Sequence, residues 1–184
     1  MLTDSTRSPG DATVGKSALA EIFHSDGAHF LKNYTMTTGV EMVTKVVNIP
    51  ETADAVEIFI FDSAGKEIFY GTLEKLWEFP SLLCLVYDIT SEKSFKSCAK
   101  WLERARAAAH GMQLPGVLIG NKTDLAERRA VEFKEAQEWA MKQGLDYFET
   151  SAKEMDNYGA PFHKLAHSFH QMYQERVELI QSIM

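Results

Sequence analysis

A glycine-rich run near the start of the chain, GDATVGKS at residues 10–17, leaves few folds open. It fits the pattern G-x-x-x-x-G-K-[ST], whose backbone N–H groups surround the phosphates of a nucleotide at the N-terminus of a helix. Lys16 would bring a positive charge to the phosphates, and the Ser17 hydroxyl could bind Mg2+. The nucleotide contacts expected here are Gly10, Ala12, Thr13, Val14, Gly15, Lys16, Ser17 and Ala18. An ordinary glycine turn before a helix is the alternative, and a preceding strand would confirm the loop.

Apolar stretches with strand character alternate with longer stretches of helical period, which predicts a three-layer α/β domain with a mostly parallel sheet. Strands are expected at Val40 to Ile49, Val56 to Asp62, Leu82 to Asp88, Gly116 to Asn121 and Asp146 to Glu149. Helices are expected at Lys16 to Phe23, Glu67 to Trp77, Ser91 to Ala109, Val131 to Gln143 and Pro161 to Ser182. The short link from Pro50 to Asp54 predicts an antiparallel hairpin between the first two of these strands.

The 184 residues suit one domain, which we place at residues 10–184 after an atypical polar segment at residues 1–9. That segment offers Leu2 as its one apolar side chain besides the first methionine, and Pro9 lacks the N–H that a central strand needs. We therefore expect the first central strand to be missing or replaced. Without this anchor for the phosphate loop, the chain should bind nucleotide weakly or fold poorly alone.

Two further motifs directly follow predicted strands, where α/β folds bind their ligands. One is NKTD at residues 121–124, and the other is ETSAK at residues 149–153. The carboxylate of Asp124 could accept hydrogen bonds from two adjacent donors of guanine, whereas adenine has an acceptor there and no amine beside it. These motifs indicate guanine specificity, although each residue type is also common in solvated turns.

Together, these motifs resemble the N-K-x-D and S-A-K motifs of small GTPases of the Rab kind, from Gly10 to the end of the chain. The resemblance implies the P-loop small-GTPase fold and binding of GTP or GDP with Mg2+. It also implies that the asparagine contacts the base and braces its loop, that the lysine stem covers one base face, and that the alanine N–H meets the guanine carbonyl. The residues carried over are Asn121, Lys122, Asp124, Ser151, Ala152 and Lys153.

The resemblance extends to the segments that sense the γ-phosphate. DSAG at residues 62–65 is similar to the D-x-x-G of the family, with Asp62 orienting the Mg2+ shell and the Gly65 N–H sensing the phosphate. In the run from Tyr34 to Val40, Thr37 takes the place of the Mg2+-binding threonine, and Phe30 that of the aromatic residue beside the guanine. The Mg2+ ligands are then Ser17, Thr37 and Asp62. Partial core packing is the alternative for the two aromatic residues.

Lys66 stands where GTP-hydrolysing members of the family usually carry a glutamine that orients the attacking water. A protonated lysine donates hydrogen bonds but accepts none, so we expect slow hydrolysis. The β-carbon of Ala12, at a position that is commonly glycine, would also crowd an arginine supplied by an activating protein. The alternative is that Lys66 is a surface residue and another group orients the water.

Residues 22–30, 59–67 and 82–88 resemble, more closely still, the Rab-like GTPases of the intraflagellar transport B complex. This likeness implies a role in ciliary traffic, with a β-sandwich subunit and other subunits of that complex as partners. The net charge of -7 argues against nucleic acid as a partner. We expect no direct membrane anchor, because the last residues lack a cysteine for prenylation, and we expect a cytoplasmic and ciliary location.

Two alternatives to a GTPase switch remain. A non-catalytic interaction subunit would keep the fold without nucleotide cycling, and an ATP-using P-loop kinase is opposed by the guanine motifs. Three histidines, His163, His167 and His170, share a predicted helix at spacings that could hold a metal, but a solvated flank is the favoured interpretation.

Overall fold

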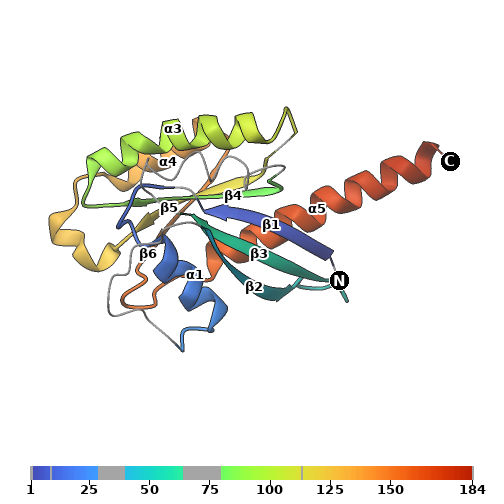
Figure 1. Cartoon of the computed structure of the whole chain (residues 1–184), viewed down its shortest axis with the longest axis horizontal. Coiled ribbons are helices and arrows are strands. Elements are labelled where there is room, and N and C mark those ends of the chain that lie inside the picture. Colours follow the sequence, from blue (N-terminus) through green and yellow to red (C-terminus); the bar gives the residue numbers. More distant parts are fainter. Residues whose placement is uncertain (1, 9, 29–39, 64–79, 113, 184) are drawn as a thin grey trace.

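A computed structural model covers residues 1–184, and it describes all of them except 1, 9, 29–39, 64–79, 113 and 184. The described part is a six-stranded sheet between two layers of helices, with strand order β2-β3-β1-β4-β5-β6 (Figure 1). The strands are β1 Leu2–Ser8, β2 Val40–Asn48, β3 Ala55–Ser63, β4 Leu82–Asp88, β5 Gly116–Asn121 and β6 Asp146–Thr150. All neighbouring strands pair parallel except β2 and β3, which form the predicted antiparallel hairpin.

The first strand corrects one prediction from the sequence. Residues 2–8 form β1 between β3 and β4, in parallel register with β3 from Leu2↔Val56 to Ser8↔Asp62 and with β4 at Thr6↔Leu82 and Arg7↔Leu83. The expectation of a missing central strand was wrong, because the ladder uses main-chain groups that polar residues also possess. The proline that weighed against a strand follows the last residue of β1. The phosphate loop therefore has a strand before it.

Four of the described helices agree with the predicted ranges to within two residues: α1 Lys16–His24, α3 Glu92–Ala108, α4 Phe133–Lys142 and α5 Ala160–Ile183. The 3-10 helix η2 Thr123–Arg128 was not predicted. The predicted helix from Glu67 to Trp77 lies outside the described residues. Among the helices described, none is both long and apolar enough to cross a membrane.

The sheet separates two apolar clusters. Residues of α1 and α5 pack on one face, and residues of α3 and α4 pack on the other. Successive residues of β4 serve opposite clusters, so the whole strand is buried and shows no polar alternation. Cys84 and Cys98 are both buried, and burial raises the pKa of Cys98 to about 12.

The apolar repeat of the last helix, at Phe162, Leu165, Phe169, Met172 and Leu179, predicts one continuous stripe against the sheet, and the structure shows this only in part. Phe162 and Leu165 are buried against the sheet, but Leu179 is 61% exposed, because α5 continues well beyond the strands (Figure 1). A continuous core stripe was therefore a wrong prediction for the end of the helix. His170 also departs from the predicted solvated flank, since it is buried and its Nε2 lies 2.8 Å from Asp54 Oδ2. Among the described residues, no three His, Cys, Asp or Glu side chains form a metal-binding group.

Candidate nucleotide-binding site

Most of the motifs found in the sequence meet at one edge of the sheet, where the parallel strands end. The phosphate loop joins β1 to α1, Asp62 is near the end of β3, and Asn121 ends β5 opposite Thr150 of β6. Three loops distant in the sequence are thus neighbours in space. This edge is where α/β folds bind ligands.

The two glycines of the phosphate loop are required by its geometry. Gly15 has φ +99°, and a β-carbon there would lie 2.2 Å from Asn121 Nδ2. A β-carbon on Gly10 would lie 2.5 Å from the carbonyl oxygen of Val86. Helix α1 then begins at Lys16, so the loop opens onto a helix N-terminus, which attracts anions. The strand, loop and helix together favour a phosphate loop over an ordinary glycine turn.

Lys16 is buried within this loop. Its ammonium donates to the carbonyl oxygens of Gly10 at 2.9 Å and Asp11 at 2.8 Å. Burial lowers its pKa to about 8, and the charges of Asp62 and Asp11 act in the opposite direction. A buried cation beside a helix N-terminus is suited to an anionic ligand.

Two of the three predicted Mg2+ ligands are in contact. The Ser17 hydroxyl donates a hydrogen bond to Oδ2 of Asp62, whose side chain is buried. A hydroxyl and a carboxylate are the hard oxygen donors that Mg2+ takes, so these residues fit the ion. Thr37, the third predicted ligand, lies outside the described residues.

The side chain of Asn121 connects the three loops. Its Nδ2 donates to the Val14 carbonyl oxygen at 2.9 Å, and its Oδ1 accepts from Ala152 N at 3.1 Å and from Thr150 Oγ1 at 3.2 Å. The bracing role implied by the resemblance is thus visible in the geometry. Ala152 N already has an acceptor, so a contact of this N–H with a guanine carbonyl stays a prediction.

Asp124 lies in the first turn of η2 with its carboxylate held in place. Its Oδ1 accepts from the Ser151 hydroxyl at 2.7 Å, and its Oδ2 lies 3.7 Å from Lys153 Nζ. Each carboxylate oxygen can accept more than one hydrogen bond, so capacity remains for a pair of donors on a base. Lys122, with φ +73°, directs its ammonium to Asp88 Oδ2 at 2.6 Å.

The structure also shows site residues that the motifs did not indicate. Asp88 holds Lys122, and although burial acts to raise the pKa of Asp88, hydrogen bonds from Lys122 and Thr90 lower it below its usual value. In the sequence, Asp88 could have been noticed as an acidic residue at the end of an apolar predicted strand. Thr150 belongs to the ETSAK run at residues 149–153, but no role was predicted for it.

A hydrogen-bonded network of four side chains, called the brace below, adjoins the loops after β5 and β6; its members are Tyr87, Arg129, Tyr147 and Glu149. Arg129, just after η2, makes two hydrogen bonds of 2.8 Å to Glu149, just before the S-A-K loop. The Tyr147 hydroxyl donates to Glu149 at 2.7 Å and lies 2.7 Å from the Tyr87 hydroxyl. Burial acts to raise the pKa of Glu149, but the bonds from Arg129 and Tyr147 outweigh it and lower that pKa. Burial raises the pKa of Tyr87 and of Tyr147.

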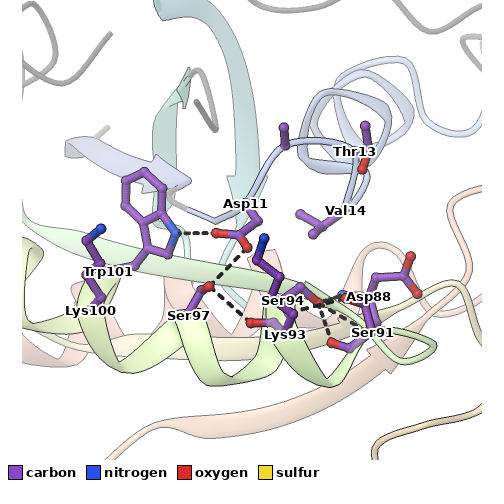
Figure 2. Close-up of a pocket in the computed structure, with 11 residues that line it drawn as sticks. Asp11, Thr13, Val14, Asp88, Ser91, Lys93, Ser94, Ser97, Lys100 and Trp101 are labelled. Carbon is purple, nitrogen blue, oxygen red and sulfur yellow. Dashed lines mark hydrogen bonds between the residues drawn. The ribbon is translucent and has the colours of Figure 1, made fainter. Parts of the chain in front are cut away.

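A cavity of about 680 Å3 adjoins the phosphate loop on the side of α3 (Figure 2). Ala12, Thr13 and Val14 line it from the loop, and residues between Ser91 and Trp101 line it from the helix. Among the described residues around it, none belongs to the two guanine loops. The cavity is therefore separate from the predicted base site.

The remaining predicted site residues are Phe30, Thr37, Gly65 and Lys66, all of which lie outside the described residues. Of the others, the structure brings the phosphate loop, Asp62, Asn121, Asp124, Ser151 and Ala152 to one edge of the sheet. Their individual roles toward a nucleotide stay predictions.

A phosphate loop between β1 and α1, with polar loops after β5 and β6, defines a P-loop domain of the small-GTPase type. Residues 9–171 match the Ras family, and the chain belongs to that family. It is 63% identical over 174 residues to the intraflagellar transport protein 27 homologs of Bos taurus and Homo sapiens, covering 95% of this chain and 94% of each relative.

More distant relatives extend the same picture. Intraflagellar transport protein 27 of Chlamydomonas reinhardtii is 41% identical over 179 residues, covering 94% of this chain and 86% of the relative. Ras-related protein Rab-30 of Homo sapiens is 39% identical over 157 residues, covering 85% of this chain and 75% of the relative. The chain is thus similar to Rab-like small GTPases, and most strongly, among these, to those with intraflagellar transport names.

Proposed function

We propose that this protein binds GTP and GDP with Mg2+ and acts as a slow small-GTPase switch in intraflagellar transport. The observation that carries the proposal is the position of Asn121, which joins the phosphate loop at Val14 to the base-reading loop at Ala152. A phosphate site and a purine-reading carboxylate are thereby held in one unit. Membership of the Ras family supports guanine nucleotides as the ligands.

Asp124 supplies the selection of the base. Its carboxylate accepts hydrogen bonds and donates none, so it matches the adjacent N1–H and amine of guanine and opposes the N1 acceptor of adenine. The Ser151 hydroxyl fixes one carboxylate oxygen at 2.7 Å, so the acceptor does not have to be ordered when the base binds. This arrangement favours GTP over ATP.

Lys16, Ser17 and Asp62 bind the phosphates of the nucleotide and the Mg2+ ion. The ammonium of Lys16 exchanges main-chain carbonyl partners for phosphate oxygens, while Ser17 and Asp62, with Thr37, hold the ion. When bound, Mg2+ neutralises charge on the β- and γ-phosphates. The Gly65 N–H senses the γ-phosphate, and the lysine at position 66 slows hydrolysis because it accepts no hydrogen bond from water.

The partners are proposed from the relatives. Two similar proteins bear the name intraflagellar transport protein 27 homolog and cover nearly the whole chain, so we place this chain in the same machinery at the cilium. A β-sandwich subunit and other subunits of the B complex are the expected partners. Co-purification of a tagged chain from ciliated cells, with identification of bound proteins by mass spectrometry, tests this assignment.

The decisive experiment identifies the nucleotide carried by the purified protein. The protein is denatured, and the released nucleotide is separated by chromatography and quantified against the chain. GDP or GTP at about one per chain supports the switch. No nucleotide, together with no binding of added GDP, supports the competing function of a non-catalytic interaction subunit, which Lys66 favours. Release of adenine nucleotide would sink the proposal.

A further inference from the structure

Asp11 occupies one of the variable positions of the phosphate-loop pattern, yet it connects the loop to α3 (Figure 2). Its Oδ1 accepts a hydrogen bond from the indole Nε1 of Trp101 at 3.1 Å. Its Oδ2 accepts one from the hydroxyl of Ser97 at 3.0 Å. Both oxygens of one carboxylate are thus directed to successive turns of the same helix.

The main chain of the same residue contacts the phosphate-binding lysine. The carbonyl oxygen of Asp11 lies 2.8 Å from Lys16 Nζ, and the neighbouring carbonyl of Gly10 lies 2.9 Å from it. Asp11 therefore lies between α3, through its side chain, and the ammonium, through its backbone. A movement of Asp11 displaces one of the two carbonyls on which the ammonium rests.

The α3 end of this connection is rigid. Trp101 is 1% exposed and belongs to the apolar cluster that contains Cys98 and Leu102, so packing restrains its ring. The single proton of the Ser97 hydroxyl has two acceptors at 3.0 Å, Asp11 Oδ2 and the Lys93 carbonyl oxygen, and the carboxylate is the stronger acceptor of the two. Hydrogen bonds to an ionised carboxylate are stronger than neutral ones.

We propose that Asp11 is a positioning residue that ties the phosphate loop to α3 and thereby sets how long a bound guanine nucleotide stays on the protein. The inference rests on the proposed function, since it assigns a control of retention to the same site. Helix α3 becomes the fixed support for Lys16. The nucleotide is retained because the loop needs no further ordering to hold its phosphates.

The first test needs no nucleotide. In protein labelled with nitrogen-15, substitution Trp101→Phe assigns the indole N–H signal of Trp101 among those of the three tryptophans. Asp11→Ala should shift this signal and speed its hydrogen exchange by at least about tenfold, because the indole loses its acceptor. Asp11→Asn keeps an acceptor oxygen and should retain most of the protection. An unchanged signal in Asp11→Ala would overturn the proposed connection.

The second test measures release of a fluorescent GDP analogue in the presence of Mg2+. Asp11→Ala should release it about tenfold faster than the natural protein, and Asp11→Asn should stay within about threefold, because the amide oxygen can replace a carboxylate oxygen. Trp101→Phe removes the donor from the other side and should also accelerate release. Lys96→Ala, an exposed change on the same helix, is the matched control and should leave the rate unchanged.

The outcomes separate the two proposals. If the natural protein binds no guanine nucleotide, the proposed function fails, whereas the indole signal still tests the connection. If the natural protein binds GDP and Asp11→Ala releases it at the natural rate, the positioning role is overturned. Equal release rates for Asp11→Asn and Asp11→Ala also overturn it, since a hydrogen-bonding role requires rescue by the amide. If Asp11→Ala does not fold, the release rates of Asp11→Asn and Trp101→Phe are compared instead, and Trp101→Phe should release the nucleotide faster than Asp11→Asn.

Discussion

The side-chain amide of Asn121 donates a hydrogen bond to the main-chain carbonyl oxygen of Val14, 2.9 Å away. The first residue of the motif predicted to recognise the base therefore also contacts the phosphate loop, although 107 positions separate the two in the chain. The same side chain accepts from Ala152 N and Thr150 Oγ1. The phosphate loop and the loops predicted to recognise the base are consequently linked through one buried amide.

Asn121→Ala should destabilise the protein by about 3 kcal/mol, because it leaves the buried polar groups of Val14, Thr150 and Ala152 without this partner. Urea unfolding followed by circular dichroism measures the change. Asn48→Ala, at an exposed position of β2, is the control and should cost less than about 0.5 kcal/mol. A cost as small as that of the control would show that the amide does not join the loops.

Asp124→Asn should lower affinity for GDP by about a hundredfold, since two hydrogen bonds to a charged acceptor are lost. The introduced amide can donate to the second carbonyl of xanthine, so XDP should bind better than GDP. Competition against a fluorescent nucleotide measures both affinities. Glu127→Gln, at an exposed position of η2, should keep the preference for guanine. An unaltered preference in Asp124→Asn would place base recognition elsewhere.

The pKa of Lys16, lowered to about 8 by burial, predicts a pH dependence of nucleotide binding. The phosphates of a nucleotide favour the charged form of Lys16. Above about pH 8, where Lys16 of the free protein is deprotonated, nucleotide binding should therefore be accompanied by uptake of a proton at Lys16. Affinity for GDP should therefore fall about sixfold between pH 7.2 and pH 8.8. Calorimetry in two buffers of different ionisation enthalpy measures the affinity and the proton uptake.

Lys16→Arg is the control for this effect, because a guanidinium stays charged over the whole range. Whatever its affinity, that variant should show no comparable fall. In the nucleotide-free natural protein, Lys16 is deprotonated in the folded state but still protonated in the unfolded state between pH 8 and pH 10.5. The free energy of unfolding should therefore rise with pH in this window. An affinity for GDP that is independent of pH would contradict the assigned role of the ammonium.

Glu149→Gln should destabilise the fold by about 2 kcal/mol at pH 7, because the guanidinium of Arg129 loses its ionised partner in a mostly buried site. The pKa of Glu149 is lowered in the folded protein, so its contribution is present above pH 4.5 and is lost as pH falls through the folded value. Urea unfolding at pH 7, 5 and 4 measures this. The difference in unfolding free energy between the natural protein and Glu149→Gln should become smaller as the pH falls.

Glu92→Gln provides the comparison for Glu149, since Glu92 is paired with Lys96 on the exposed face of α3. Its effect should stay below about 0.5 kcal/mol at every pH. A gap for Glu149→Gln that stays constant from pH 7 to pH 4 would mean that the brace does not depend on the charge of the carboxylate.

Lys66→Gln should raise the single-turnover rate of GTP hydrolysis by about tenfold, because an amide can both donate to the attacking water and accept from it. Lys66→Ala removes the lysine without adding an amide and should give no such rise. Rapid mixing with radiolabelled GTP and separation of the products measure both rates. Equal rates for the natural protein and Lys66→Gln would show that another group orients the water.

The phosphate loop and the places of the motifs after β5 and β6 could be predicted from the sequence, because each motif is defined by local spacing. The backbone of Gly15, with φ +99°, favours glycine for a local reason, whereas the contacts that a β-carbon on Gly10 or Gly15 would make with Val86 or Asn121 arise only in the folded chain. Strands β4 and β5 were predicted with their observed bounds, since both are short apolar runs buried on two faces. For these segments the local apolar pattern was enough to predict the strands.

Contacts between distant segments were decided only by the tertiary structure. Residues 2–8, which are polar apart from Leu2, form a central strand because β3 and β4 offer hydrogen-bonding edges on both sides, which no local pattern of those residues records. Asp11 meets Trp101 from 90 positions away, and His170 meets Asp54 from 116. The sequence lists the groups that can donate and accept, but only folding brings particular donors and acceptors within bonding distance.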